Sequence, residues 1–290
     1  MKKIGMVGIG LMGHGIASNL LKHGHPLIVL EHIGNQPLDQ LLATGAQTAK
    51  DCRQLASQVD MIILCVTGSP QVEAVMLGDQ GLLKGLRAGT IVIDCSTAIP
   101  SSTIRIAQAV TAAGGQFVDA PMTRTAKEAA EGRLNLLVGA SPENFALCRP
   151  ILACFAENIT HAGDVGAGHQ MKLLHNFVSL GNATLLAEAA ASASKARIDP
   201  AVFVDVLTKG GGWGAPLERL KPFILTGDSS GLKFSIDNAK KDLTYYNAMA
   251  RDMHADSTVA AAILATLELA SKAGQGGVFV PELVRIINDR

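Results

Sequence analysis

Short apolar runs alternate with amphipathic stretches through the first half of the chain. The apolar runs, each long enough for one strand, cover residues 3–7, 26–31, 61–66, 90–94 and 116–119. Helical patterns lie between them, for example over residues 13–22 and 100–113. Such alternation favours a parallel sheet covered by helices on both faces. Residues 134–138 can add one more strand.

The second half of the chain has a different pattern. Residues 163–168 form a glycine-rich hinge, and residues 167–196 then predict one long helix that is rich in Ala, Leu and Glu. No strand pattern follows. Shorter helices are predicted over residues 200–207, 213–225, 236–253, 258–273 and 280–288.

A glycine-rich turn follows the first predicted strand. Residues 8–13 read Gly-Ile-Gly-Leu-Met-Gly, which is G-x-G-x-x-G at the start of a predicted helix. Glycines at this spacing permit a tight turn, close approach of the backbone to a pyrophosphate, and packing of helix on strand. The phosphates then lie at the helix N-terminus, where free N–H groups favour an anion. The predicted contacts are made by Gly8, Gly10, Leu11, Met12 and Gly13.

Glu31 ends the second predicted strand, where a carboxylate binds the ribose hydroxyls of a dinucleotide. A carboxylate repels a 2′-phosphate, so NAD is favoured over NADP. The alternatives are a tight turn that binds no ligand and a Glu31 side chain that is only a solvated charge.

The patterns together predict an α/β fold. A Rossmann-like, doubly wound parallel sheet occupies residues 1–163, and an all-helical domain that includes the long interdomain helix occupies residues 164–290.

Composition narrows the classes of partner. The 290 residues include 25 basic and 25 acidic side chains without a basic run, which argues against a nucleic-acid binder. The apolar runs are too short to cross a bilayer, and the N-terminus lacks a signal-peptide pattern. Five cysteines form no C-x-x-C pair, so neither a disulfide framework nor a metal site is predicted. We therefore expect a cytoplasmic protein that binds neither nucleic acid nor membrane.

Lys172 and Asn176 lie four residues apart on the predicted long helix and so share one of its faces. They follow the glycine-rich hinge, where a cleft between two domains is expected. A lysine in a cleft can exchange a proton with an alkoxide oxygen, and an asparagine can orient a hydroxyl. By itself, however, a Lys-x-x-x-Asn pair is also typical of a solvated helix surface.

Several ordered segments resemble the β-hydroxyacid dehydrogenase family, which includes 3-hydroxyisobutyrate dehydrogenases and tartronate semialdehyde reductases. The matching segments are residues 8–19 (GIGLMGHGIASN), 94–97 (DCST), 119–121 (DAP), 132–139 (GRLNLLVG), 166–176 (GAGHQMKLLHN) and 241–243 (KDL). The resemblance implies a Rossmann domain, a long interdomain helix and a helical domain that supports homodimers or homotetramers. It also implies an NAD-dependent oxidoreductase that interconverts a small β-hydroxy acid and its semialdehyde or keto acid.

The resemblance assigns roles to positions that match the family motifs. Lys172 matches the family's catalytic lysine, and Asn176 matches the asparagine that binds substrate beside it. The other matched positions are near the nicotinamide or substrate (Ser96, Thr97), in a cofactor loop (Val66, Thr67), and at a cofactor-side lysine of the helical domain (Lys241).

The chain departs from the family pattern after residues 119–121. Most relatives carry Ser-Gly-Gly there and hold the substrate carboxylate with it, whereas this chain has Thr123, Arg124 and Thr125. Sulfolactaldehyde reductases resemble it in having Arg-Thr. A guanidinium binds carboxylate, sulfonate or phosphate well, so we hypothesise that Arg124 holds a second anionic group of the substrate. The alternative is an ion pair of Arg124 with Glu128 or Glu131 at a helix start.

Two further positions have open roles. His175 stands where the family commonly has asparagine, and it either titrates beside Lys172 or simply packs. Trp213 follows a glycine-rich turn and is expected in the pocket, in a subunit contact or in the core.

Other functions compete with hydroxy-acid oxidation. One is reduction of a short anionic aldehyde such as sulfolactaldehyde or succinic semialdehyde. An imine reductase shares the implied fold but usually lacks the lysine found here at Lys172. A non-catalytic NAD(P)-binding scaffold is the remaining alternative, against which the joint presence of Lys172, Asn176 and Lys241 argues.

Overall fold

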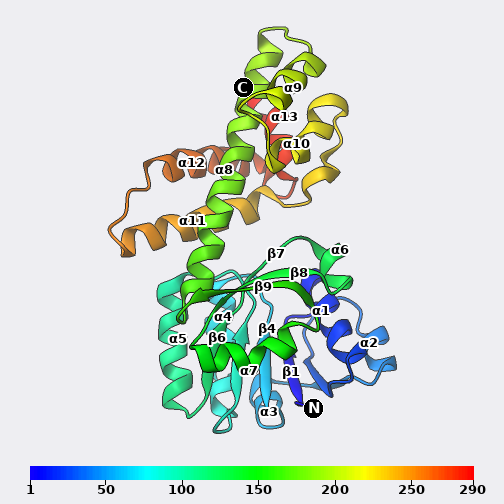
Figure 1. Cartoon of the computed structure of the whole chain (residues 1–290), viewed down its shortest axis with the longest axis vertical. Helices are drawn as coiled ribbons and strands as arrows, with labels where there is room; N and C mark the ends of the chain where they lie inside the picture. The colour runs from blue at the N-terminus through cyan, green and yellow to red at the C-terminus, as the bar shows by residue number, and fades with distance from the viewer. The chain divides into compact units, whose positions relative to one another are not determined.

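The computed structural model describes residues 1–290. It divides into two compact units, Met1–Lys172 and Leu173–Arg290. All the strands belong to the first unit, and the second is helical (Figure 1). The Rossmann-like sheet followed by a helical domain, predicted from the sequence, is confirmed.

Six parallel strands in the order β3-β2-β1-β4-β5-β6 form most of the sheet, the strand order of dinucleotide-binding domains. Their bounds are β1 (Ile4–Val7), β2 (Leu27–Leu30), β3 (Gln47–Ala49), β4 (Met61–Leu64), β5 (Ile91–Asp94) and β6 (Gln116–Asp119). All except β3 were predicted. That strand has three residues, of which only Ala49 is buried, so it carries no apolar run.

The far end of the sheet is antiparallel in part. Strand β8 (Leu134–Gly139) confirms the strand predicted over residues 134–138, but it runs antiparallel to β6 and to the short β7 (Met122–Thr123). The connection from β7 to β8 holds only the short helix α6 (Ala126–Ala130), which is less than the crossover that parallel strands need. Strand β9 (Ala156–Gly163) then pairs parallel with β8. Most residues of β9 are not buried, so the strand has no apolar run that would predict it from sequence.

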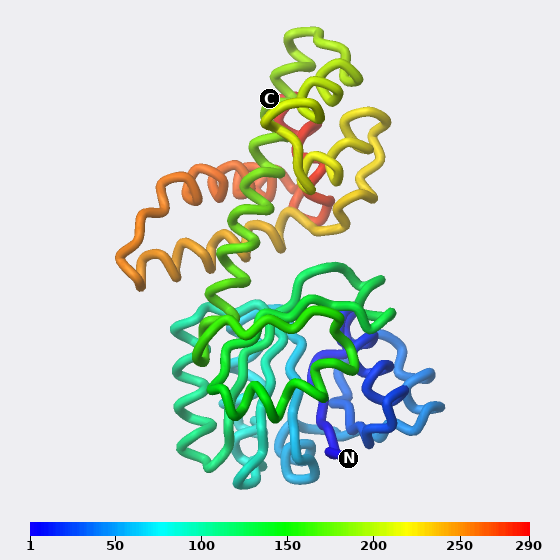
Figure 2. Tube along the Cα trace, viewed as in Figure 1, coloured from blue at the N-terminus to red at the C-terminus, as the bar shows by residue number.

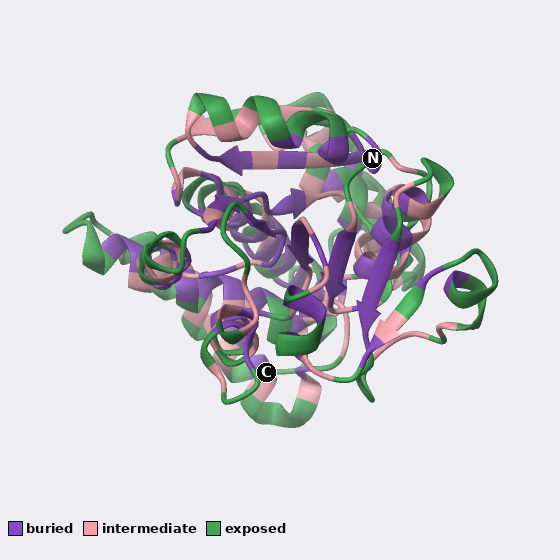
Figure 3. Cartoon of the chain, turned by 90° about the horizontal axis from the view of Figure 1, so that it is seen from below, coloured by how far each residue is buried: buried purple, intermediate pink, exposed green.

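Helices cover both faces of this sheet because successive strand residues point to opposite faces. One face packs against α1 (Leu11–Lys22), α2 (Asp39–Ala43), α6 and α7 (Pro142–Leu152). The other packs against α3 (Cys52–Ala56), α4 (Ser69–Leu77) and α5 (Pro100–Ala112). Figure 3 shows the buried strands between the exposed outer surfaces of these helices.

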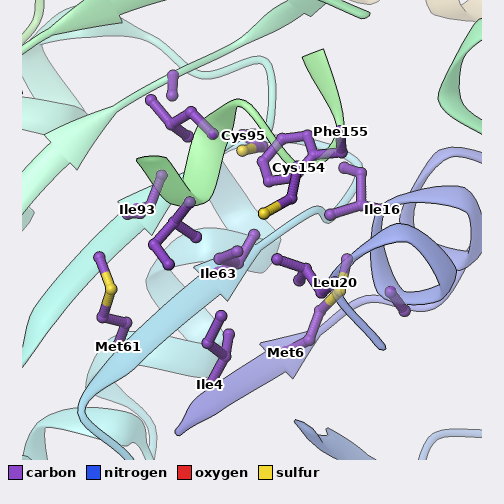
Figure 4. Packing of buried hydrophobic residues seen from close by; sticks show 14 of the residues in the cluster. Ile4, Met6, Ile16, Leu20, Met61, Ile63, Ile93, Cys95, Cys154 and Phe155 are labelled. Carbon is purple, nitrogen blue, oxygen red and sulfur yellow. The ribbon is translucent and has the colours of Figure 1, made fainter. Parts of the chain in front are cut away.

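The close packing on the first face is visible in Figure 4. Ile16 and Leu20 of α1 lie beside Met6 of β1 and Ile63 of β4, and all four side chains are inaccessible to solvent. Burying an aliphatic side chain of this size stabilises the fold by roughly 1.5–3 kcal/mol. The α1 helix, which begins at the glycine-rich turn, is therefore firmly seated on the sheet.

The helical unit is organised around α8 (Ala167–Lys195), which agrees with the long helix predicted over residues 167–196 and contains the boundary between the two units. The helices that follow are α9 (Pro200–Lys209), α10 (Ala215–Thr226), α11 (Ile236–Asp252), α12 (Thr258–Ala270) and α13 (Leu283–Asn288). Helices α11 and α12 pack side by side as an antiparallel pair (Figures 1 and 2). None of the helices has the length and apolar character that a membrane span requires.

Candidate functional site

The glycine-rich turn after β1 has the backbone geometry of a dinucleotide cradle. Gly8 has a φ of +94°, and a Cβ atom there would lie 2.2 Å from the carbonyl oxygen of Cys65. A Cβ at Gly13 would lie 2.0 Å from the carbonyl oxygen of Gly8. A Cβ at Gly10, by contrast, would meet no atom within 4 Å. Two glycines are thus required by the fold, and the third keeps the surface of the turn open.

The N-terminus of α1 is available to an anion. Gly10 is the N-cap residue and offers no side-chain hydrogen bond to the first turn. The N–H groups of the next residues, among them Leu11 and Met12, therefore lack the capping acceptor that most helices have. A pyrophosphate fits this position because it supplies acceptor oxygens and negative charge at the positive end of the helix dipole.

The loop after β2 continues the cradle. Glu31 follows the strand directly, is exposed, and donates its backbone N–H to the carbonyl of Ala49 at 2.9 Å. Asn35 links this loop to the glycine-rich turn, because its Oδ1 accepts from the N–H of Ile9 at 3.3 Å and its Nδ2 donates to the carbonyl of Leu30 at 2.9 Å. The sequence reasoning missed Asn35, since its spacing from residues 8–13 matches no motif.

The ends of β4 and β5 are joined by a serine. The backbone N–H of Val66 donates to Oγ of Ser96 at 3.0 Å, and the N–H of Ser96 donates to Oδ1 of Asp94 at 2.9 Å. Thr67 is exposed and Thr97 is half-buried. The carboxyl ends of parallel strands are where ligands bind in open α/β sheets, so these predicted residues occupy the expected edge.

A carboxylate also caps the beginning of α8. Asp119, at the end of β6, accepts the N–H of Gly166 at 2.6 Å and the N–H of His169 at 2.8 Å. Burial raises the pKa of the Asp119 carboxyl, while the hydrogen bonds from the backbone N–H groups of Gly166 and His169 act in the opposite direction. This cap fixes the first turn of α8, which begins at Ala167, five residues before Lys172.

Lys172 is half-buried and ends the first unit. Helix α8 is continuous through this position, so Lys172 and Asn176 share a helix face as predicted. Asn176 is buried, with 7% of its surface exposed. Its side-chain Nδ2 donates to Oδ2 of Asp242 at 2.6 Å, and its Oδ1 lies 2.9 Å from Nδ1 of His175.

Lys241 and Asp242 lie together on α11 in the helical unit. The Lys241 ammonium is 3.2 Å from Oδ1 of the buried Asp242 and 5.6 Å from the centre of the Tyr245 ring. Asp242 therefore binds both Asn176 and Lys241, two of the residues assigned to the site from sequence. The sequence reasoning gave Asp242 no role, and its partner Asn176 lies 66 positions away along the chain.

Comparison with known proteins identifies the family. The NAD-binding domain model of 6-phosphogluconate dehydrogenase matches residues 3–163, and that of NADP-dependent 3-hydroxyisobutyrate dehydrogenase matches residues 166–287. The chain is 34% identical to 2-(hydroxymethyl)glutarate dehydrogenase of Eubacterium barkeri, over 83% of the chain and 80% of that protein. This chain belongs to the β-hydroxyacid dehydrogenase family. The resemblance seen in the sequence is confirmed, and the chain is an oxidoreductase with NAD-binding domains.

Other family members match almost end to end. The chain is 32% identical to 3-sulfolactaldehyde reductase of Escherichia coli K12, over 95% of the chain and 92% of that protein. It is also similar to a solved 3-hydroxyisobutyrate dehydrogenase of Salmonella typhimurium, with a TM-score of 0.84 and 29% identity over 98% of this chain and 99% of that one. Both comparisons cover the sheet and the helical unit together.

The departure from the family pattern at residues 123–125 has a defined local structure. Arg124 has a φ of +80°, and its guanidinium contacts Glu157 of β9 and the carbonyl of Arg133. The alternative prediction, an ion pair of Arg124 with Glu128 or Glu131, is wrong about the partner, which is Glu157. Glu128 instead accepts from the N–H and hydroxyl of Thr125 at 3.0 and 2.6 Å.

The hydroxyls on either side of Arg124 are also engaged. Thr125 caps α6, because its Oγ1 accepts from the N–H of Lys127 at 3.3 Å and the Glu128 carboxylate completes the capping box. Oγ1 of Thr123 accepts from Nδ2 of Asn135 at 3.2 Å. Trp213 has 68% of its surface exposed, so the expectation that it could be a core residue is wrong.

The pKa of the Cys65 thiol, behind the glycine-rich turn, is raised by burial to about 12, so the thiol stays protonated at neutral pH.

Proposed function

We propose that this chain interconverts a small β-hydroxy acid and its semialdehyde or keto acid with NAD, and that Lys172 is the general acid/base. The observation that carries the proposal is the placement of Lys172. It stands in the second turn of a helix whose start is capped by Asp119, in the unit that also holds the dinucleotide cradle. A proton-transfer group needs such a fixed position to act within hydrogen-bond distance of the substrate oxygen.

Lys172 handles the proton of the reaction. In the oxidative direction its Nζ accepts the proton of the substrate hydroxyl as the carbonyl forms, and in the reductive direction it returns that proton to the alkoxide oxygen. NAD, when bound, supplies the acceptor for the hydride that leaves the carbinol carbon. Proton transfer by a positioned side chain accelerates such a step by about 100- to 10,000-fold.

Asn176 orients the substrate in this proposal. Its amide Nδ2 is held by Asp242, which fixes the side-chain plane and leaves the amide group in one orientation. A buried amide with a defined orientation discriminates between donors and acceptors on a substrate. Lys241, on the other oxygen of Asp242, adds a positive charge suited to the cofactor or to an anionic substrate.

We assign NAD as the preferred cofactor. Glu31 is exposed directly after β2, beside the loop that Asn35 ties to the glycine-rich turn. A carboxylate at this position accepts hydrogen bonds from ribose hydroxyls and disfavours the phosphate of NADP. The residues after β2 therefore favour NAD over NADP.

Reduction of a short anionic aldehyde is a second candidate. It is favoured by Arg124, a cation in the turn after residues 119–121, and by the similarity to 3-sulfolactaldehyde reductase. The ion pair with Glu157 neutralises the positive charge of Arg124. A sulfonate or carboxylate of the substrate would therefore have to compete with Glu157 for the guanidinium. This competition makes Arg124 a specificity residue rather than a primary anchor.

The absorbance of NADH tests the proposal directly. The purified protein is mixed with NAD or NADP and a panel of hydroxy acids, and with NADH or NADPH and the matching semialdehydes, sulfolactaldehyde included. Turnover of a β-hydroxy acid with NAD supports the main proposal. Turnover of only an anionic aldehyde supports the second candidate, and bound NADH with no turnover of any compound contradicts both.

We further propose that the chain is a cytoplasmic homodimer or homotetramer. The helical unit exposes apolar side chains around a groove of about 440 Å³ between α8 and α12, among them Val178, Leu185 and Val259. A second copy of the chain would remove this surface from water. Light scattering should give a mass of at least two chains, and Leu185→Glu should shift it toward one. A monomeric wild-type protein would contradict this assembly.

A further inference from the structure

A buried polar cluster joins the carboxyl ends of β5 and β6 to the first turn of α8. Asp94 and Asp119 are register partners on the two strands, and neither is accessible to solvent. The ring of His169, which is also fully buried, lies beside both. Its Nε2 is 3.9 Å from Oδ2 of Asp94, and its Nδ1 is 3.8 Å from Oδ2 of Asp119. Buried carboxylates are costly unless they are compensated, so the cluster depends on His169 and the N–H donors around it.

The hydrogen bonds of His169 connect three parts of the first unit. Nε2 lies 3.1 Å from the carbonyl oxygen of Ser96, and Nδ1 lies 2.8 Å from the hydroxyl of Thr103 on α5. A carbonyl oxygen only accepts, so Nε2 must carry a hydrogen. In the neutral ring Nδ1 then accepts from the hydroxyl of Thr103. The side chain of His169 thereby holds the segment after β5 against α5 and α8.

The first turn of α8 packs closely against the sheet. A Cβ atom at Gly168 would lie 2.4 Å from the carbonyl of Leu137, and one at Gly139 would lie 2.5 Å from Oδ1 of Asp119. The helix start and the Asp119 side chain are thus in direct contact with the sheet. Lys172 follows His169 by three residues, so the two side chains leave the helix on neighbouring positions of one face.

We propose that His169 is a positioning residue for proton transfer. It holds Ser96, and with it Thr97, and the helix turn that carries Lys172 in one rigid frame. His169 does not touch the substrate, because its side chain is fully buried. The inference rests on the proposed function, in which Lys172 must stand at a fixed distance from the reacting oxygen. A displacement of about 1 Å in such a group can cost about 100-fold in rate.

Two substitutions at this position separate positioning from general stability. His169→Leu replaces the imidazole with an apolar side chain and removes both hydrogen bonds. His169→Gln keeps them in principle, because the amide N–H can donate to Ser96 and the amide oxygen can accept from Thr103. His161→Leu is a control for the loss of an imidazole contact at an exposed position of the same unit, since Nε2 of His161 lies 2.8 Å from the carbonyl oxygen of Ala140. Ser102→Ala controls for the loss of a buried hydroxyl on α5.

We expect His169→Leu to lower kcat by about 10- to 100-fold while the KM for NAD changes less than about two-fold. His169→Gln should recover most of that loss, and the two control variants should turn over like the wild type. Hydrogen exchange of the protein without ligands gives a second readout. In His169→Leu, peptides that cover residues 96–99 and 166–172 should exchange faster, and in His169→Gln they should exchange like the wild type.

The outcomes separate this inference from the proposed function. A wild-type protein that turns over none of the panel would defeat the proposed function, and hydrogen exchange would still show whether His169 holds the two segments in one frame. Unchanged exchange in both segments of His169→Leu would overturn it. So would an equal loss of kcat in His161→Leu, because the effect would then be general destabilisation. A His169→Gln variant that folds but is as slow as His169→Leu would show that the hydrogen bonds do not position the site.

Discussion

His169 and Asn176 are two buried polar residues of α8, seven positions apart, and each is held by a buried aspartate of its own unit. At His169 the aspartate binds backbone: Asp119 accepts two N–H groups and thereby fixes where the helix begins. At Asn176 the aspartate binds a side chain: Asp242 accepts from Nδ2 and fixes the orientation of an amide. Lys172 lies between the two positions along the helix.

The difference shows how one helix serves two purposes. The contacts of His169 are complete within the protein, so that end of α8 has the character of a structural anchor. The contacts of Asn176 leave its Oδ1 beside His175, and Asp242 also binds Lys241, so this end presents functional groups in a fixed arrangement. We expect substitutions at the first end to affect rate through geometry, and those at the second to affect both substrate binding and rate.

The largest effect is expected at the residue between the two anchors. Lys172→Ala should lower kcat by about 100- to 10,000-fold, because it removes the group that exchanges the substrate proton. Binding of NADH, measured by fluorescence, should stay within about two-fold of the wild type. Lys240→Ala is a suitable control, because that lysine pairs with Asp237 and Ser271 at 2.9 and 2.6 Å. Normal turnover by Lys172→Ala would contradict the proposed role of Lys172 in proton transfer.

A smaller effect is expected at the second anchor. Asp242→Ala should lower kcat/KM by about 10- to 100-fold, since a hydrogen bond to a charged group contributes about 1.5–3 kcal/mol. Both the KM for the hydroxy acid and kcat should change, whereas His169→Leu should act mainly on kcat. Asp242→Asn retains one acceptor oxygen and should lose less. Steady-state kinetics of these variants beside Asp237→Asn, on the same helix, would show whether the two anchors really differ.

The smallest effect is expected at Arg124, outside both anchors. Arg124→Gly should raise KM by about two- to five-fold for substrates with a second anion and leave other substrates unchanged, because a part-exposed ion contact is weak. Glycine suits the φ of +80° at this position, so the backbone should tolerate the change. Glu157→Gln should lower the same KM by freeing the guanidinium. An equal effect on all substrates would exclude an anion site at Arg124.

Regular patterns made much of the fold predictable. Strands β2 and β4 are continuous apolar runs, β1, β5 and β6 have apolar centres, and α8 is a long segment free of proline, so each carries a local signal. Strand β9 has no such signal, because residues such as Glu157 and Asn158 are exposed on it. The sheet's antiparallel end depends on how β7 pairs with β8, which no local pattern specifies.

The site was predictable where a motif carries the chemistry. The glycine-rich turn, Lys172 and Asn176 were all assigned from sequence, although their roles remain predictions. His169 and Asn35 were missed because their partners lie far along the chain: His169 reaches Ser96 and Thr103, and Asn35 reaches Ile9. Only the register of β5 and β6 places Asp94 beside Asp119. Contacts of this kind become visible when the sheet is assembled.

The most direct test follows a hydrogen atom through the reaction. A β-hydroxy acid that turns over in the screen is prepared with deuterium on its carbinol carbon and incubated with NAD and the protein, and the cofactor is analysed by mass spectrometry. The account predicts that deuterium appears in the reduced nicotinamide with the wild-type protein and far more slowly with Lys172→Ala. Reduced cofactor without the label, or labelling at an equal rate in the variant, would contradict it.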